Sequence, residues 1–144
     1  MENNALSAAD YLRKAERYCA SAERCASQVR LKLQQWDCPQ EEWEAILHRL
    51  YQNGYLDDLR FARAYAHDKL LYQGWGRKKI EVMLGGSHLP SEVIHTALRE
   101  IDANEYCRIL KKVAGQKRGA TREQKIRFLM QRGFLYDEVV KVIG

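Results

Sequence analysis

Residues 84–98 read LGGSHLPSEVIHTAL, and the apolar side chains of this stretch set a pattern that occurs three times in the chain. Leu89, Ile94 and Leu98 follow Leu84 at offsets of 5, 10 and 14 residues. The same offsets recur upstream and downstream, in Leu33, Cys38, Trp43 and Leu47 and in Leu129, Phe134, Val139 and Ile143. Chance is a poor explanation for three such sets. The sequence therefore predicts a tandem repeat in which each unit packs on its neighbour.

The repeat period is irregular because of one insertion. The first positions of the three sets lie 51 and then 45 residues apart. The difference falls between Leu47 and Phe61, which are 14 residues apart, whereas the corresponding Leu98 and Tyr106 are 8 apart. We therefore predict three repeats in the 144 residues, at 1–54, 55–102 and 103–144.

Helical spacing of apolar residues runs through the whole sequence, and no alternating strand pattern of useful length competes with it. Pro39 and Pro90 follow the second position of their sets, and proline is tolerated at the first position of a helix. Thr121 and Gln124 form a capping-box signature. The predicted fold class is all-α, with three short helices per repeat, near residues 5–19, 21–35, 40–53, 57–72, 76–86, 90–101, 103–116, 121–132 and 136–143.

Composition points to a soluble, cytoplasmic protein without a metal. The chain begins with neither a basic nor an apolar leader, and no apolar run approaches the ~18 residues of a transmembrane helix. The four cysteines form no C-x-x-C pair, and no histidine stands at ligand spacing from them. We expect reduced, mostly buried thiols, no metal site and no cofactor.

Positive charge gathers in the last repeat. The net charge is +5, yet residues 103–133 alone hold nine Lys or Arg against two Glu, a local balance of +7. Lys and Arg supply most of the sequence-independent affinity for nucleic acid, so this segment predicts an anionic partner; the alternative is a solvated face without one. The candidate binding residues of this segment are Lys111, Lys112, Lys117, Arg118, Arg122, Lys125 and Arg127.

A second basic group follows the Gly-Trp-Gly turn at residues 74–76. The turn is not a dinucleotide loop, because Lys79 replaces the third glycine of that motif and no strand precedes it. Tyr72 and Trp75 stand beside cations here, a combination that suits nucleic acid or an acidic protein surface. The alternative is a Trp75 partly buried between repeats. The candidate binding residues of this group are Arg77, Lys78 and Lys79.

No catalytic constellation is visible in the sequence. The four histidines are scattered over different predicted helices, and none stands beside a candidate nucleophile. Asp57 and Asp58 lie at a predicted helix start, where a carboxylate acts as a cap before it acts as a catalytic acid. The sequence predicts a binding module with no catalytic residues.

The block GYLDDLRFA at residues 54–62 closely resembles the RecX family of regulatory proteins, bacterial modulators of the RecA recombinase. The resemblance continues at Tyr65, Ile80 and Leu84 and returns at FLMQRGF, residues 128–134, so it covers nearly the whole chain. It implies an elongated, curved array of three three-helix repeats that binds along the groove of a RecA–DNA filament. Such proteins inhibit ATP hydrolysis and strand exchange and limit filament growth.

The resulting hypothesis is a non-enzymatic regulator of DNA repair and recombination. Its expected partners are a RecA-type recombinase filament and single- or double-stranded DNA; it does not bind a membrane, and it is a monomer. Two alternatives stay open: a helical DNA-binding module without a recombinase partner, and an enzyme acting on nucleic acid, which the missing carboxylate cluster disfavours. A recombinase ATPase assay beside a DNA-only binding assay separates the three.

Overall fold

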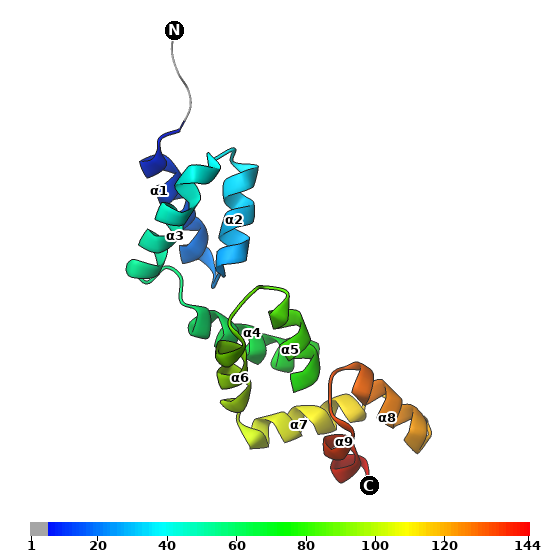
Figure 1. Ribbon diagram of the computed structural model, residues 1–144. Helices are drawn as coiled ribbons and strands as arrows, with labels where there is room; N and C mark the ends of the chain where they lie inside the picture. Colours follow the sequence, from blue (N-terminus) through cyan, green and yellow to red (C-terminus); the bar gives the residue numbers. More distant parts are fainter. Residues whose placement is uncertain (1–5) are drawn as a thin grey trace. The chain divides into compact units, whose positions relative to one another are not determined.

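The computed structural model describes residues 6–144 and is helical throughout that range (Figure 1). Nine α-helices and one short 3-10 helix form its regular structure, and none of the described residues lies in a strand. The predicted all-α class with nine helices is therefore confirmed. Contacts between residues divide the chain into two compact units, which we call the N-terminal unit, ending at Phe61, and the C-terminal unit, beginning at Ala62.

Three α-helices pack around an apolar core in the N-terminal unit. In chain order its elements are α1 (Ala8–Ser21), α2 (Ala26–Gln35), the 3-10 helix η1 (Gln40–Glu42) and α3 (Trp43–Gln52). The core centres on Val29, Leu33 and Leu50, which are fully buried. The Tyr11 hydroxyl donates a hydrogen bond of 3.1 Å to the Trp36 carbonyl. This bond ties α1 to the C-terminal end of α2.

Helix α2 begins after Cys25, so the predicted start at residue 21 was wrong. The preceding residues are used in ending α1: the Ser21 hydroxyl donates to the Tyr18 carbonyl at 2.8 Å, and the Arg24 Nε donates to the same oxygen at 3.1 Å. Cys25 is extended, with φ −112° and ψ 166°, and its N–H donates to the Gln28 side chain at 2.9 Å. Side-chain bonds to the backbone thus replace a turn of helix.

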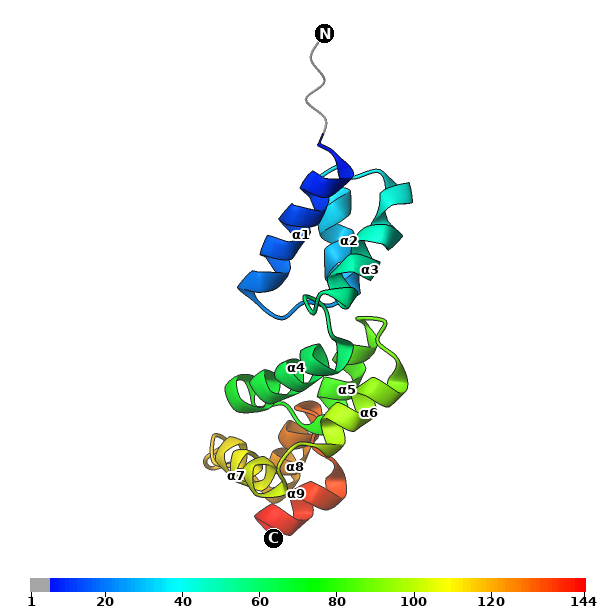
Figure 2. The ribbon, with the colours of Figure 1, turned by 90° about the vertical axis from the view of Figure 1, so that its left-hand side faces the viewer.

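Six helices form or enter the C-terminal unit. They are α4 (Asp58–Gln73), which spans the division at Phe61, and α5 (Arg77–Gly85), α6 (Ser91–Arg99), α7 (Ala103–Ala114), α8 (Arg122–Gln131) and α9 (Tyr136–Ile143). Helix α5 packs on α6, and α7 packs on both α8 and α9, as Figure 2 shows. The start of the predicted first helix at residue 5 lies outside the described residues.

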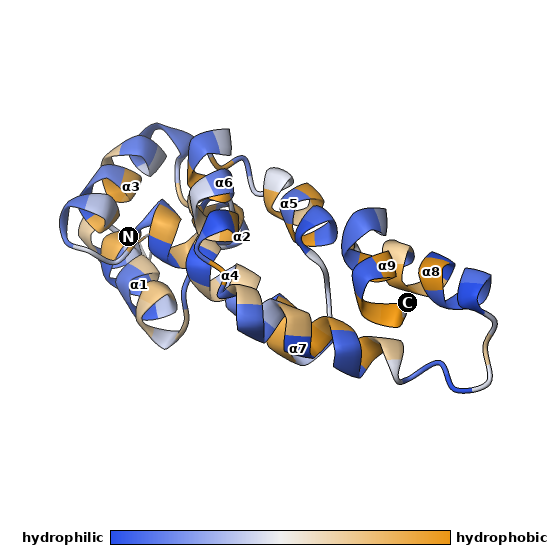
Figure 3. Cartoon of the chain, turned by 90° about the horizontal axis from the view of Figure 1, so that it is seen from below, coloured by the Kyte–Doolittle hydropathy of each residue, from blue (hydrophilic) through white to orange (hydrophobic). Residues whose placement is uncertain are grey.

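The repeated apolar positions form the core of both units. Of the twelve positions that define the three sets, nine are buried, and Trp43, Leu89 and Ile143 are half-buried. Polar and apolar residues alternate along the same helices, as expected for helices with one buried face (Figure 3). The sequence repeat therefore records core positions.

Helix α5 starts against the turn between α8 and α9. The Gly76 N–H donates to the Arg132 carbonyl at 2.7 Å, and the Lys78 N–H donates to the Gly133 carbonyl at 3.1 Å. A Cβ atom on Gly76 would lie 2.4 Å from the carbonyl carbon and oxygen of Gly133. Only glycine permits this approach of two backbones. The Gly-Trp-Gly turn thus joins the second predicted repeat to the third.

Candidate nucleic-acid interface

Two capped helices, α7 and α8, carry five of the seven basic residues predicted in the last repeat. The Asp102 carboxylate begins α7 by accepting a 2.8 Å hydrogen bond from the backbone N–H three residues on. Thr121 and Gln124 begin α8 with the predicted capping box, whose two bonds measure 3.1 and 2.9 Å. The last turn of α7 holds Lys111 and Lys112. Positive charge is favourable there, because the helix C-terminus carries partial negative charge.

The C-terminal ends of α4 and α7 enclose one hollow of about 290 Å³. Tyr72, Gln73, Lys112, Gln116 and Arg132 supply its polar lining. The Arg132 Nη1 donates to the Gln73 carbonyl at 3.1 Å, so a backbone contact orients the guanidinium. The Tyr72 ring is free for contact, because the residue is 76% exposed.

A second hollow of about 360 Å³ lies on α8 and the preceding loop. Lys117, Arg127 and Phe128 are among the residues that line it. The Lys117 Nζ lies 5.1 Å from the centre of the Phe128 ring, and the Arg132 guanidinium carbon lies 4.9 Å from the same centre. Phe128 and Arg132 thereby connect the two hollows.

We call these six residues the basic–aromatic surface: Tyr72, Lys112, Lys117, Arg127, Phe128 and Arg132. Among the described residues that line the two hollows, none is acidic. Lys and Arg neutralise phosphates, and aromatic rings beside them stack on unpaired bases. The arrangement is therefore suited to a nucleic-acid strand.

The remaining predicted residues of the last repeat lie around this surface without lining the hollows. Lys111, Arg118 and Arg122 are exposed, and Lys125 is half-buried. The Arg122 Nε donates to the Gly144 carbonyl at 3.4 Å. We expect these side chains to add to the positive potential rather than to form a pocket.

Arg77 is engaged inside the C-terminal unit. Its guanidinium pairs with the Glu138 carboxylate at 3.2 Å and lies 3.9 Å from the centre of the Tyr106 ring. The Tyr106 hydroxyl accepts from the Arg77 N–H at 3.0 Å and donates to Glu138 at 3.1 Å. Burial is the main reason that the pKa of Tyr106 is raised, to about 12. Since these contacts occupy Arg77, we do not include it in the interface.

Lys78 and Lys79 line neither of the two hollows. The Lys78 Nζ lies 3.5 Å from a Glu81 carboxylate oxygen, and the Lys79 Nζ lies 4.5 Å from the centre of the Trp75 ring. Lys69 lies over the same ring at 5.0 Å. Trp75 is half-buried, as the alternative interpretation of the turn predicts.

Three residues of the basic–aromatic surface were absent from the predicted site. The local charge of residues 103–133 includes Arg132, and Tyr72 stands beside the second basic group, yet the sequence predicts neither of them as a binding residue. Phe128 and Arg132 stand four residues apart on and just beyond α8, and this spacing is a local signal that would have linked them. Their proximity to Tyr72 has no signal in the sequence.

Two further sequence expectations bear on other kinds of site. All four cysteines are free thiols; three are buried and Cys107 is half-buried, which confirms the expected burial. Over residues 6–144 no helix is long and apolar enough to span a bilayer.

The fold defines an all-helical repeat protein, and comparisons with known proteins identify its family. Family models for the first and second three-helix domains of RecX match residues 12–50 and 57–98. The chain belongs to the RecX family of regulatory proteins.

Relatives of similar length support this assignment. The regulatory protein RecX of Pectobacterium atrosepticum is 28% identical over 151 aligned positions, which cover 96% of this chain and 91% of that protein. The regulatory protein RecX of Thermus thermophilus is 33% identical over 93 positions, covering 65% of this chain and 62% of that protein.

Solved structures show the same fold. The crystal structure of RecX from Lactobacillus salivarius matches with a TM-score of 0.81 at 18% identity, covering 94% of each chain. A second crystal structure, of a regulatory protein RecX, matches with a TM-score of 0.77 at 22% identity, covering 99% of this chain and 81% of the other. At these identities the likeness concerns the fold alone.

Proposed function

We propose that this protein binds a RecA-type recombinase filament on DNA, in the cytoplasm and as a monomer, and reduces its ATP hydrolysis and strand exchange. Membership of the RecX family supports the choice of partner. The observation that carries the proposed DNA contact is the basic–aromatic surface, where four cations and two aromatic rings surround two hollows. The protein acts by binding, and the recombinase performs the chemistry.

The contact with DNA combines electrostatic attraction, which contributes more to affinity, with base stacking, which contributes less. Lys112, Lys117 and Arg127 supply charge to phosphates, and Tyr72 supplies an exposed ring to an unpaired base. Each phosphate contact on a single strand contributes roughly −0.7 to the slope of log affinity against log salt concentration. Three such contacts would account for a slope of about −2.

The test is a triple variant that removes charge and keeps the side chains polar: Lys112→Gln, Lys117→Gln and Arg127→Gln. We expect weaker inhibition of the recombinase ATPase on single-stranded DNA and a salt slope shallower by about 2 for DNA binding. Thermal stability should stay near that of the parent, because exposed substitutions change the free energy of unfolding little.

The matched control removes three exposed cations elsewhere, by Arg17→Gln, Arg49→Gln and Lys141→Gln. It lowers the net charge by the same amount and should leave more of the inhibition and of the salt slope intact. If both triple variants behave alike, net charge rather than the basic–aromatic surface determines binding.

A DNA-binding module without a recombinase partner is the second candidate, since the basic–aromatic surface alone suits nucleic acid. The same assays separate the two functions. A parent protein that binds DNA yet leaves the recombinase ATPase unchanged over its titration range would support the second candidate.

A further inference from the structure

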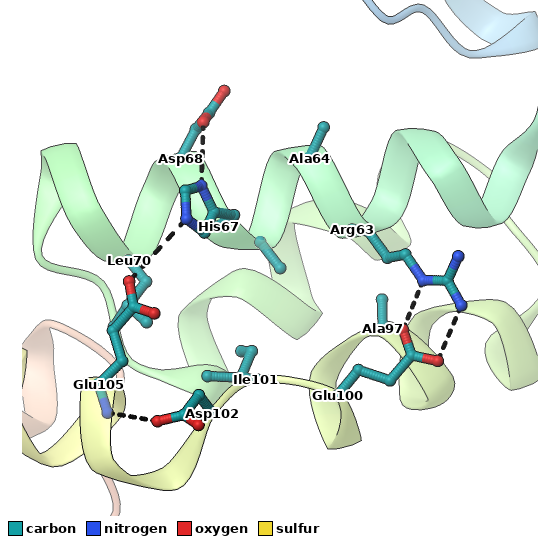
Figure 4. Close-up of a pocket in the computed structure, with 11 residues that line it drawn as sticks. Arg63, Ala64, His67, Asp68, Leu70, Ala97, Glu100, Ile101, Asp102 and Glu105 are labelled. Atoms are coloured by element: carbon teal, nitrogen blue, oxygen red, sulfur yellow. Dashed lines mark hydrogen bonds and ion pairs between the residues drawn. The ribbon is translucent and has the colours of Figure 1, made fainter.

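A groove of the C-terminal unit shares no lining residue with the basic–aromatic surface and has different chemistry. It measures about 510 Å³ and is formed by α4, the end of α6 and the start of α7 (Figure 4). Its apolar lining includes Ala66, Leu70 and Ala97, which are 1%, 1% and 2% exposed. Ile101 extends this lining at the turn into α7. The floor of the groove therefore belongs to the buried core of the unit.

The rim of the groove is acidic, and part of its charge is already used. The Arg63 guanidinium makes two bonds to the Glu100 carboxylate, at 2.5 and 2.9 Å. These bonds are the main reason that the pKa of Glu100 lies below its ordinary range. Asp102 caps α7 at 2.8 Å. Glu100 and Asp102 are thus fixed by contacts within the protein.

Asp68 and Glu105 carry the rest of the negative charge of the rim. They flank the His67 ring, whose Nδ1 lies 3.6 Å from Asp68 and whose Nε2 lies 3.9 Å from Glu105 (Figure 4). Both distances exceed those of ordinary hydrogen bonds. The residues that line the groove include one Arg and four acids, which give a net charge of −3 when histidine is counted as neutral. On the same count the whole chain carries +5.

The acidic rim and the apolar floor together restrict the kind of ligand that the groove can bind. A phosphate would be repelled by the rim, and a hydrated ion would gain nothing from the apolar floor. A long cationic side chain fits both features, because Lys and Arg bury an aliphatic stem and keep a charged head. The volume lies within the roughly 300–1,000 Å³ of ordinary ligand pockets, which admits a few side chains.

The groove is also placed to act together with the basic–aromatic surface. Glu105 lines the groove and Lys112 lines the first hollow, and both are on α7. Seven residues of helix correspond to about 10 Å along its axis. One rigid helix therefore presents a negative groove and a positive surface, which suits a partner that offers basic protein and DNA phosphate side by side.

We propose that this groove docks a cationic segment of the recombinase, whose Arg or Lys head lies beside the Glu105 carboxylate and whose aliphatic neighbours pack on Leu70 and Ile101. The inference rests on the proposed function, since it names the protein side of the same complex. The basic–aromatic surface contacts DNA, and the acidic groove contacts protein.

The experiment uses the full chain with Asp68→Asn and Glu105→Gln together, which removes two charges and preserves size. We expect the concentration for half-maximal inhibition of the recombinase ATPase on single-stranded DNA to rise about tenfold. Affinity for single-stranded DNA without recombinase should be unchanged or slightly higher, because negative charge has been removed. The control is Glu41→Gln with Asp137→Asn, two exposed acids outside the groove, and it should inhibit like the parent.

The outcomes are distinct. Inhibition by the groove variant at parental concentrations would overturn the inference and leave the proposed function standing. A parent that fails to inhibit the ATPase at all would overturn the proposed function, and the inference with it. A melting curve of each variant shows whether it is folded; if the double variant is not, Glu105→Gln alone provides the same test, with a smaller expected rise.

Discussion

Gly76→Ala adds a single methyl group where α5 meets the α8–α9 turn, and we expect it to lower the stability of the C-terminal unit strongly. The added Cβ would lie 2.4 Å from the Gly133 carbonyl and 2.5 Å from the Phe134 nitrogen, well inside contact distance. Because these are backbone atoms, the two segments must move apart. The movement would lengthen the hydrogen bonds from the Gly76 and Lys78 N–H groups, now 2.7 and 3.1 Å.

The magnitude follows from these contacts. Overpacking a tight site costs roughly 1–3 kcal/mol, and each weakened backbone hydrogen bond roughly 1 kcal/mol. We expect Gly76→Ala to lower the free energy of unfolding of the C-terminal unit by about 3 kcal/mol. It should also weaken DNA binding, since Gly76 holds the Arg132 carbonyl and Arg132 lines the first hollow.

Urea unfolding followed by circular dichroism measures the loss, and amide hydrogen exchange at Lys78 locates it. Gly85→Ala is the matched control: it lies in the last turn of α5, with no atom within 4 Å of an added Cβ. The control should be neutral or stabilising by up to about 1 kcal/mol. If Gly76→Ala is as stable as Gly85→Ala, the contact between Gly76 and Gly133 does not hold the second and third predicted repeats together.

Two further predictions concern stability. Burial raises the pKa of Tyr106 to about 12 from an unfolded value of 10.0, so its contribution to folding is complete below pH 10 and is lost as the pH rises through 12. Tyr106→Phe should therefore show a shallower loss of stability than the parent between pH 10 and 12 in unfolding measurements; identical slopes would contradict the assignment. Phe61→Ala should cost roughly 3–5 kcal/mol, because the ring is buried, and calorimetry measures this loss. A variant that melts like the parent yet loses ATPase inhibition would instead identify Phe61 as a contact residue.

Most of the helices could be predicted because their signals are local. Offsets of 5, 10 and 14 residues mark buried positions, and the capping box at Thr121 is complete within four residues. The predicted start of α2 was wrong because side-chain contacts with the backbone, rather than the spacing of apolar residues, decide where this helix begins. Arg24 bonds back to the Tyr18 carbonyl, and this competition between side chain and helix is invisible to periodicity.

The candidate site could be predicted only in part. Clustered charge indicated Lys112, Lys117 and Arg127 without the structure, because nine cations within about thirty residues are visible as composition. The first hollow, however, is lined by both Arg132 and Gln73, and the Arg132 guanidinium contacts the Gln73 carbonyl, 59 residues away in the chain. No local pattern in the sequence predicts a contact between residues so far apart in the chain.

The sequence by itself determined the helical class, the repeated core positions and the polarised charge, since each follows from spacing or composition over short stretches. Only the tertiary structure decided which cations are engaged within the protein and which line an open hollow. Arg77 and Lys112 both belong to basic stretches, yet Glu138, 61 residues beyond Arg77, pairs with its guanidinium, whereas Lys112 lines an open hollow. The physical reason is that a charge takes its role from the groups that packing brings within a few ångströms, and packing joins residues far apart in sequence.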